Sequence, residues 1–135
     1  MSDILADLAQ VDLRDPYLLR LKEIGKELRE SAEAALAVGP VLRFMEANRH
    51  QELGTPGPLV HFLESVPGYE TSLIESLERM PTQQTVWMLN RLINAASDDE
   101  EKPLLDLMRR IAGTAEEADV RQDAIDFLEF QDDPE

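Results

Sequence analysis

The sequence predicts an all-α protein. Apolar residues recur at helical spacing in nearly every segment. No segment shows the sustained apolar–polar alternation of a half-buried strand, and the Asn-Gly and Asp-Gly pairs typical of tight hairpins do not occur. The periodic segments are separated by proline, glycine or helix-capping residues. Together these three observations favour helices joined by short turns.

A short amphipathic turn at 5–11 precedes a long helix that is predicted over 16–38. Asp15 belongs to the residue types that cap helix starts, and Pro16 fits the first helical position, where the missing N–H of proline costs nothing. Gly39-Pro40 is typical of a helix end. A short separate helix is therefore expected over 41–45.

Helix pairs are predicted over 58–130, after the clearest loop in the chain. Two glycines and two prolines fall within residues 54–58. Later breaks are marked by Pro67-Gly68 and Pro81, and Ser97-x-x-Glu100 fits a capping box. The expected helices are 58–66, 69–80, 82–96, 99–112 and 115–130. We expect one helical domain over 1–130 and a disordered acidic tail at 131–135.

A weak internal repeat indicates how these helices pack. Apolar positions in 59–80 recur 30 or 31 residues later, in 89–111. Two helices in about thirty residues, repeated, are the pattern of an α-solenoid. The sequence therefore predicts a HEAT-like stack of antiparallel helix pairs, with an irregular helical bundle as the alternative.

The amino-acid composition excludes or disfavours several classes of functional site and partner. The chain has 135 residues, no cysteine and a formal net charge of −15. Cysteine nucleophiles, disulfides and thiolate metal sites are excluded. Binding to nucleic acid or to an anionic membrane is disfavoured, because both need a Lys/Arg surface, whereas a basic protein partner is favoured. No targeting signal or membrane-spanning run is visible, so we expect a cytoplasmic protein.

The negative charge is concentrated near the C-terminal end. Residues 98–135 contain 14 acidic and four basic residues, a net charge of −10. Helix dipoles and a solvated face explain part of this pattern. If the starts of stacked helices share one edge, the carboxylates also form a continuous negative ridge for a basic protein. The candidate binding residues are Asp98, Asp99, Glu100, Glu101, Glu116, Glu117 and Asp119.

A second candidate group surrounds the only tryptophan. Trp87, Asn90 and Arg91 fall on one face of a predicted helix. Tryptophan and arginine are enriched in binding hot spots, so this face is a candidate interface. The alternative is that Trp87 fills the core between helix pairs while Asn90 binds a loop backbone.

Catalytic patterns are missing from the sequence. There is no nucleophile elbow, no phosphate-binding glycine loop and no EF-hand spacing. His61 and Glu64, three residues apart, could share a metal ion, although a locally hydrogen-bonded histidine is the simpler interpretation. We therefore expect no catalytic residue, no metal, no cofactor and no enzymatic activity. A metal-dependent enzyme that uses His61 and Glu64 stays the third alternative.

Several segments resemble a family of small helical bacterial proteins. They are GPLVHFLE at 57–64, Tyr69, RMPT at 79–82 and TVWMLNR at 85–91. These segments are similar to immunity proteins of polymorphic-toxin or contact-dependent-inhibition loci. The resemblance covers 54–112, leaves the N-terminal helix unaccounted for and assigns no binding residue. It implies a cytoplasmic antidote that binds and blocks a cognate toxin domain.

The leading hypothesis is thus a non-enzymatic acidic protein that covers the active surface of a basic toxin, for example a nuclease. The alternative, from a different class, is a HEAT-like adaptor or scaffold that joins other proteins. The oligomeric state stays open, because Trp87 and the N-terminal apolar stripe each offer a face to a second copy.

Overall fold

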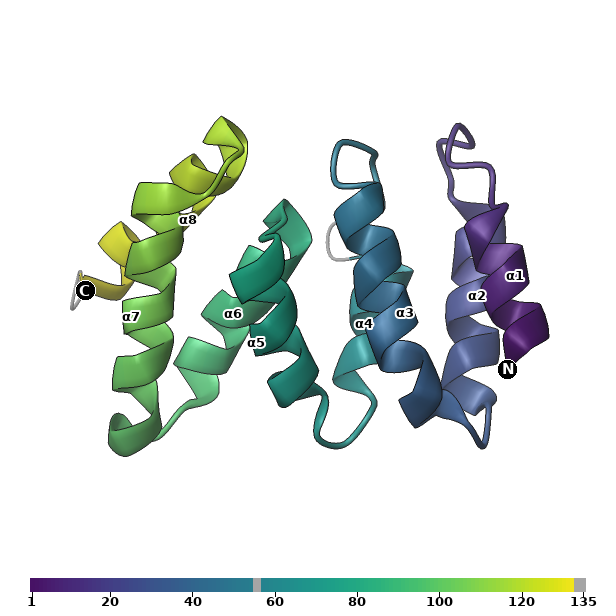
Figure 1. Cartoon of the computed structure of the whole chain (residues 1–135), viewed down its shortest axis with the longest axis horizontal. Coiled ribbons are helices and arrows are strands. Elements are labelled where there is room, and N and C mark those ends of the chain that lie inside the picture. Colours follow the sequence, from purple (N-terminus) through teal and green to yellow (C-terminus); the bar gives the residue numbers. More distant parts are fainter. Residues whose placement is uncertain (55–56, 133–135) are drawn as a thin grey trace. The chain divides into compact units, whose positions relative to one another are not determined.

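The computed structural model describes residues 1–54 and 57–132, and it is helical with no strand in these residues (Figure 1). The all-α prediction is confirmed, and the HEAT-like arrangement stays a prediction. In chain order the helices are α1 Ser2–Ala9, α2 Leu19–Glu30, α3 Ala34–Ala47, α4 Pro58–Glu64, α5 Tyr69–Arg79, α6 Gln83–Ala95, α7 Asp98–Thr114 and α8 Ala118–Asp132.

The chain clusters into two compact units where the sequence predicts one domain over 1–130. Unit 1 comprises residues 1–76 and unit 2 comprises residues 77–135, so the boundary falls within α5. The predicted disordered tail at 131–135 is wrong for its first two residues, which belong to the last turn of α8. Residues 133–135 lie outside the described residues.

The long helix predicted over 16–38 is two helices in unit 1. α2 ends at Glu30, and Ser31 has an extended backbone with φ −75° and ψ 138°. The Ser31 hydroxyl accepts a hydrogen bond of 3.1 Å from the Glu33 N–H, which gives that N–H a partner outside a helical ladder. This local competition explains why the apolar periodicity continues while the helix does not.

Both ends of that helix also differ from the predicted ones. The Asp15 carboxylate accepts hydrogen bonds from the N–H groups of Tyr17 and Leu19, at 3.0 Å each, so α2 begins only at Leu19. Pro40 lies inside α3 and does not end a helix. The ring of Pro40 deprives the Leu36 carbonyl of its helical donor, but both residues are exposed, and water can replace that donor.

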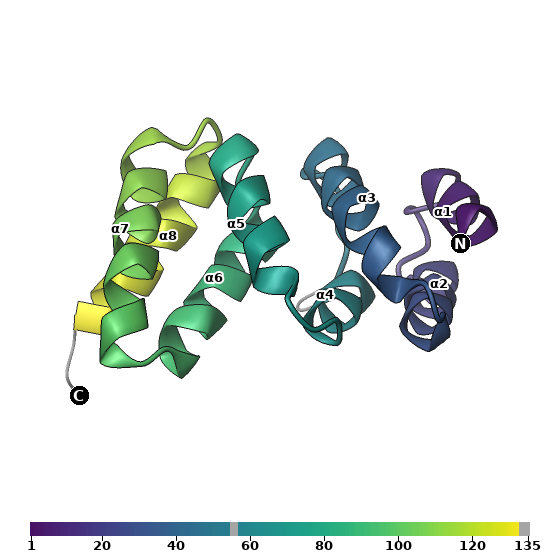
Figure 2. The same cartoon turned by 60° about the horizontal axis from the view of Figure 1, so that its bottom comes forward.

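Unit 1 buries the apolar stripe of α2 against its neighbours. Leu21, Ile24 and Leu28 are fully buried, and α2 contacts α1, α3 and α4 (Figure 2). The contact with α4 depends on Gly25, since a Cβ atom at this position would lie 3.1 Å from both Cβ and the carbonyl oxygen of Pro58. The missing side chain therefore sets the spacing of α2 and α4.

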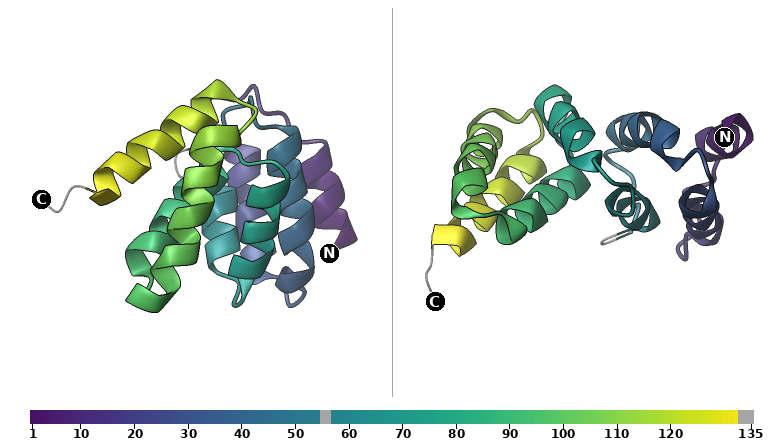
Figure 3. Two further views of the ribbon diagram at one scale, coloured as in Figure 1. Left: turned by 60° about the vertical axis from the view of Figure 1, so that its left-hand side comes forward. Right: turned by 90° about the horizontal axis from the view of Figure 1, so that it is seen from below.

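Unit 2 is built from the end of α5 and helices α6, α7 and α8, with α8 beside both α6 and α7 (Figure 3). A reciprocal capping box starts α6, because the Thr85 N–H donates to the Thr82 hydroxyl and the Thr82 N–H donates to the Thr85 hydroxyl. Buried apolar side chains come from all three helices, and they are Val86, Met88, Leu89, Ile93, Leu107, Met108, Ile111, Val120 and Ala124.

Candidate functional site

The two acidic groups predicted from the sequence do not share one edge of unit 2. Asp98–Glu101 forms the first turn of α7, whereas Glu116 and Glu117 follow its last residue and Asp119 lies in the first turn of α8. The 17 residues of α7 span about 25 Å. Figure 1 shows α7 starting at the bottom of the view and α8 starting at the top. The expected continuous ridge is therefore wrong, because consecutive antiparallel helices begin at opposite ends.

Glu100 has a structural role at the start of α7. Its carboxylate accepts hydrogen bonds from the Ser97 N–H at 3.3 Å and from the Ser97 hydroxyl at 2.7 Å. These bonds hold the pKa of Glu100 below its ordinary value. The predicted capping pair is confirmed, and Glu100 belongs to the helix cap while Asp98 and Asp99 remain exposed.

Three of the four cations in residues 98–135 are engaged within unit 2. Lys102 and Arg109 each lie 3.1 Å from the Asp106 carboxylate, and the Lys102 hydrogen bond is the main cause that lowers the pKa of Asp106. Arg121 donates to the carbonyl oxygens of Ala115 and Glu116, at 2.6 and 3.2 Å. Within residues 1–54 and 57–132, no ion pair is formed by the carboxylates of Asp98, Asp99, Glu101, Asp119, Asp126 and Glu129. The surface of α7 and α8 thus keeps most of its negative charge.

Side-chain amides join α6 to α8. The Gln131 amide donates to the side-chain oxygens of Asn90 at 2.9 Å and Asn94 at 2.6 Å. The start of α6 is also bonded to α8, because the Gln83 side-chain amide donates to the Asp123 carboxylate at 3.0 Å. Residue numbers rise together along both helices, so α6 and α8 run parallel. The interpretation in which Asn90 binds a loop backbone is wrong, since its side chain accepts a hydrogen bond from Gln131 on α8.

Trp87 lies between these two links on α6. Its side chain is half-buried, and the exposed Arg91 guanidinium lies 5.0 Å from the centroid of its ring, in cation–π range. The predicted grouping of Trp87, Asn90 and Arg91 on one side of a helix is therefore found in the structure. Trp87 is therefore only partly accessible to a partner.

The sequence did not point to Phe130, which at 70% exposure is the most exposed large apolar side chain among the described residues of unit 2. Helices α6 and α8 bury stripes that include Leu89 and Val120 against the core of unit 2, so their exposed stripes face away from it. We call the resulting patch the α6–α8 surface. It comprises Trp87, Asn90, Arg91 and Asn94 from α6, and Asp119, Asp123, Asp126, Phe130 and Gln131 from α8.

Carboxylates crowd one part of the α6–α8 surface. Burial raises the pKa of Asp123 above its ordinary value, the hydrogen bond from Gln83 lowers it, and the carboxylates of Asp126 and Asp119 raise it further. The helical spacing of residues 119, 123 and 126 places all three on the same side of α8. That spacing was a signal available in the sequence, and it also leads to Phe130 one turn later.

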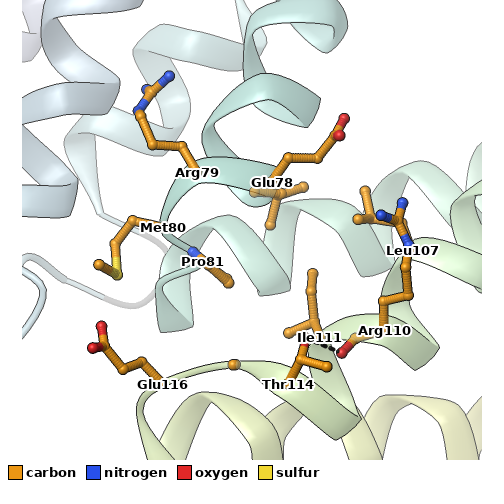
Figure 4. Close-up of a pocket in the computed structure, with 11 residues that line it drawn as sticks. Glu78, Arg79, Met80, Pro81, Leu107, Arg110, Ile111, Thr114 and Glu116 are labelled. Carbon is orange, nitrogen blue, oxygen red and sulfur yellow. Dashed lines mark hydrogen bonds between the residues drawn. The ribbon is translucent and has the colours of Figure 1, made fainter.

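A separate cavity of about 440 Å³ lies between the end of α5 and the C-terminal half of α7 (Figure 4). Leu77, Pro81 and Ile111 are among its apolar lining residues, and Arg110 and Glu116 are among the polar ones. The Thr114 hydroxyl donates to the Arg110 carbonyl at 2.6 Å, as the dashed line in Figure 4 shows. This lining suits non-covalent contact with an apolar group that is flanked by charges.

Two further observations concern metals and membranes. Within residues 1–54 and 57–132, no three His, Asp or Glu side chains are grouped closely enough to hold a metal ion, and His61 is exposed on α4. Among the same described residues, every helix is too short or too polar to cross a lipid bilayer.

Comparisons with protein families, with curated proteins and with solved structures give no match to this chain.

Proposed function

We propose that the protein is a non-enzymatic binding protein that neutralises a basic protein toxin, as an immunity protein does. One observation carries this proposal. The carboxylates on the surface of α7 and α8 largely outnumber the cations there, and most of those cations are engaged inside unit 2. A surface of this kind attracts a basic protein and speeds the encounter.

A toxin that acts on nucleic acid needs a cationic surface to hold phosphates. An acidic protein that docks on that surface excludes the nucleic acid directly, without chemistry of its own. The proposal therefore requires a partner with Lys/Arg side chains at its active face. It also requires binding that weakens as salt rises, because salt screens exposed charges over about 10 Å at 0.1 M.

Co-expression tests the biological role. The open reading frame beside this gene is expressed with and without the protein in the same host. We expect growth only when the protein is present. Equal growth in both cultures would overturn the proposal, as would a complex whose affinity is unchanged between 50 and 500 mM salt.

A protein–protein adaptor is the second candidate, and exposed apolar side chains in unit 1 favour it. Tyr17, Leu19 and Leu36 are 71%, 58% and 65% exposed. An adaptor needs at least two binding surfaces, and these side chains are in a different unit from the acidic helices. Replacing Tyr17 and Leu19 by Ser should then abolish one interaction and leave the other. If toxin neutralisation is the whole function, the same double variant protects cells as well as the original protein.

A further inference from the structure

We propose that the α6–α8 surface is the docking site for a basic segment of the partner protein, with Phe130 as the apolar anchor and the carboxylates of Asp119, Asp123 and Asp126 as acceptors for its Lys or Arg side chains. This inference rests on the proposed function and specifies where and how the basic partner binds.

Phe130 is the apolar part of the proposed docking site, and the end of α8 that carries it is bonded to α6. Phe130 is 70% exposed although burial of a phenylalanine side chain is favourable. The neighbouring Gln131 fixes this turn of α8 to Asn90 and Asn94, so the ring is presented from an ordered helix. A pre-positioned aromatic side chain loses little conformational freedom on binding, which favours affinity.

Charge complementarity identifies the occupant. Asp119 and Asp126 take part in no ion pair within the described residues, and with Asp123 they form a line of three carboxylates along α8. Cationic side chains placed along this line would relieve the mutual repulsion of the carboxylates. A segment with carboxylates there would be repelled.

Arg91 limits how a basic segment can be oriented on the α6–α8 surface. Among the described residues that make up the α6–α8 surface it is the one cation, and it lies over the Trp87 ring on the α6 side. The partner's cations must therefore face α8, while its uncharged or acidic side chains face Arg91.

The experiment uses the single tryptophan as a reporter, because Trp87 lies on the proposed surface. The probe is an 18-residue amphipathic helical peptide of Lys and Leu, titrated into the full chain. Matched peptides replace every Lys by Glu, or every Leu by Ser. We expect the Lys/Leu peptide to shift the Trp87 emission and to reduce its quenching by acrylamide. The Glu/Leu peptide should not bind, and the Lys/Ser peptide should bind at least tenfold more weakly.

Matched variants then locate the contact. Phe130→Ala should weaken binding of the Lys/Leu peptide about tenfold or more, whereas Leu36→Ala, which removes a similarly exposed side chain in unit 1, should change it less than twofold. Asp126→Lys should weaken binding more than Asp99→Lys, although both make the same change in charge. Circular dichroism checks that each variant keeps its helices.

The outcomes separate this inference from the proposed function. The docking site is overturned if a neutralised toxin binds the Phe130→Ala and Asp126→Lys variants as tightly as the original protein and leaves the Trp87 emission unchanged. The proposed function still stands in that case. If no basic protein binds the chain at all, the proposed function itself fails. Analytical ultracentrifugation tests whether a second copy occupies the surface. A dimer that the Phe130→Ala substitution dissociates would show this and would also overturn the inference. In co-expression, loss of protection by Phe130→Ala but not by Leu36→Ala supports it.

Discussion

The Ser76 hydroxyl donates a hydrogen bond of 2.7 Å to the carboxylate of Glu46, and both side chains are buried within unit 1. Glu46 lies on α3 and Ser76 on α5, so the bond joins residues thirty positions apart. Arg43, one turn earlier on α3, lies 3.9 Å from the same carboxylate but is itself exposed. The buried serine therefore provides a short, desolvated contact between α3 and α5.

Ser76→Ala is expected to destabilise the protein by about 1–3 kcal/mol, because the buried Glu46 carboxylate loses a donor. Glu46→Gln should cost less, since it keeps an acceptor and removes the buried charge. Urea unfolding followed by circular dichroism measures both. Glu75→Ala, at an exposed carboxylate on the same helix, is the control and should stay within about 0.5 kcal/mol. A Ser76→Ala loss no larger than that of the control would contradict a role for the bond.

Gly25→Ala is expected to lower stability although alanine favours helices by about 1 kcal/mol over glycine. The added Cβ would lie 3.1 Å from the Pro58 carbonyl oxygen and Cβ, and neither is the free end of a flexible side chain. Overpacking of this kind costs about 1–3 kcal/mol. Gly113→Ala, at an open helical position in α7, should instead be neutral or slightly stabilising. Thermal unfolding of the two variants distinguishes these effects, and an equal gain in both would refute close packing at Gly25.

Asp123→Asn is expected to raise the melting temperature at pH 7. Burial raises the pKa of Asp123 in the folded protein, so its ionised form costs folding free energy at neutral pH. The cost falls as the pH drops through the raised pKa, and it is absent below the ordinary aspartate value of about 3.9. The advantage of Asn should therefore shrink between pH 7 and pH 3. Glu129→Gln, at an exposed position of α8, should show a smaller effect at pH 7.

Gln131→Ala is expected to free the last turn of α8. The variant loses the hydrogen bonds to Asn90 and Asn94, while the rest of unit 2 keeps its buried side chains. Hydrogen exchange should speed up in the amides near residue 131 and stay unchanged in the middle of α7. Gln122→Ala removes a glutamine that bonds only within α8, to Asp126, and should leave the exchange near 131 unaltered.

Local chemistry made much of the fold predictable. Proline at 67 and 81 separates helices as expected, and the Ser97–Glu100 pair caps α7 as its spacing predicts. The break at Ser31 was not visible, because the apolar periodicity runs through it and only a short serine turn interrupts the backbone. A helix end determined by one side-chain hydrogen bond leaves no trace in hydrophobic spacing.

The candidate site was predictable only in part. Trp87, Asn90 and Arg91 share a helix, so their grouping followed from the sequence. The contact of Asn90 with Gln131 did not, because it depends on α8 returning beside α6 after forty residues. The opposite positions of the acidic groups at 98–101 and 116–119 follow from the reversal of direction between α7 and α8.

The bonds that hold the end of α8 against α6 are formed by neutral amides, at Asn90, Asn94 and Gln131. Dissolved ions screen charge–charge attraction but weaken such bonds far less. If the protein binds a basic partner as proposed, concentrated salt should therefore release that partner while the bonds between α6 and α8 stay formed. Under the same proposal, dilution of the salt should return the chain to its binding form without refolding.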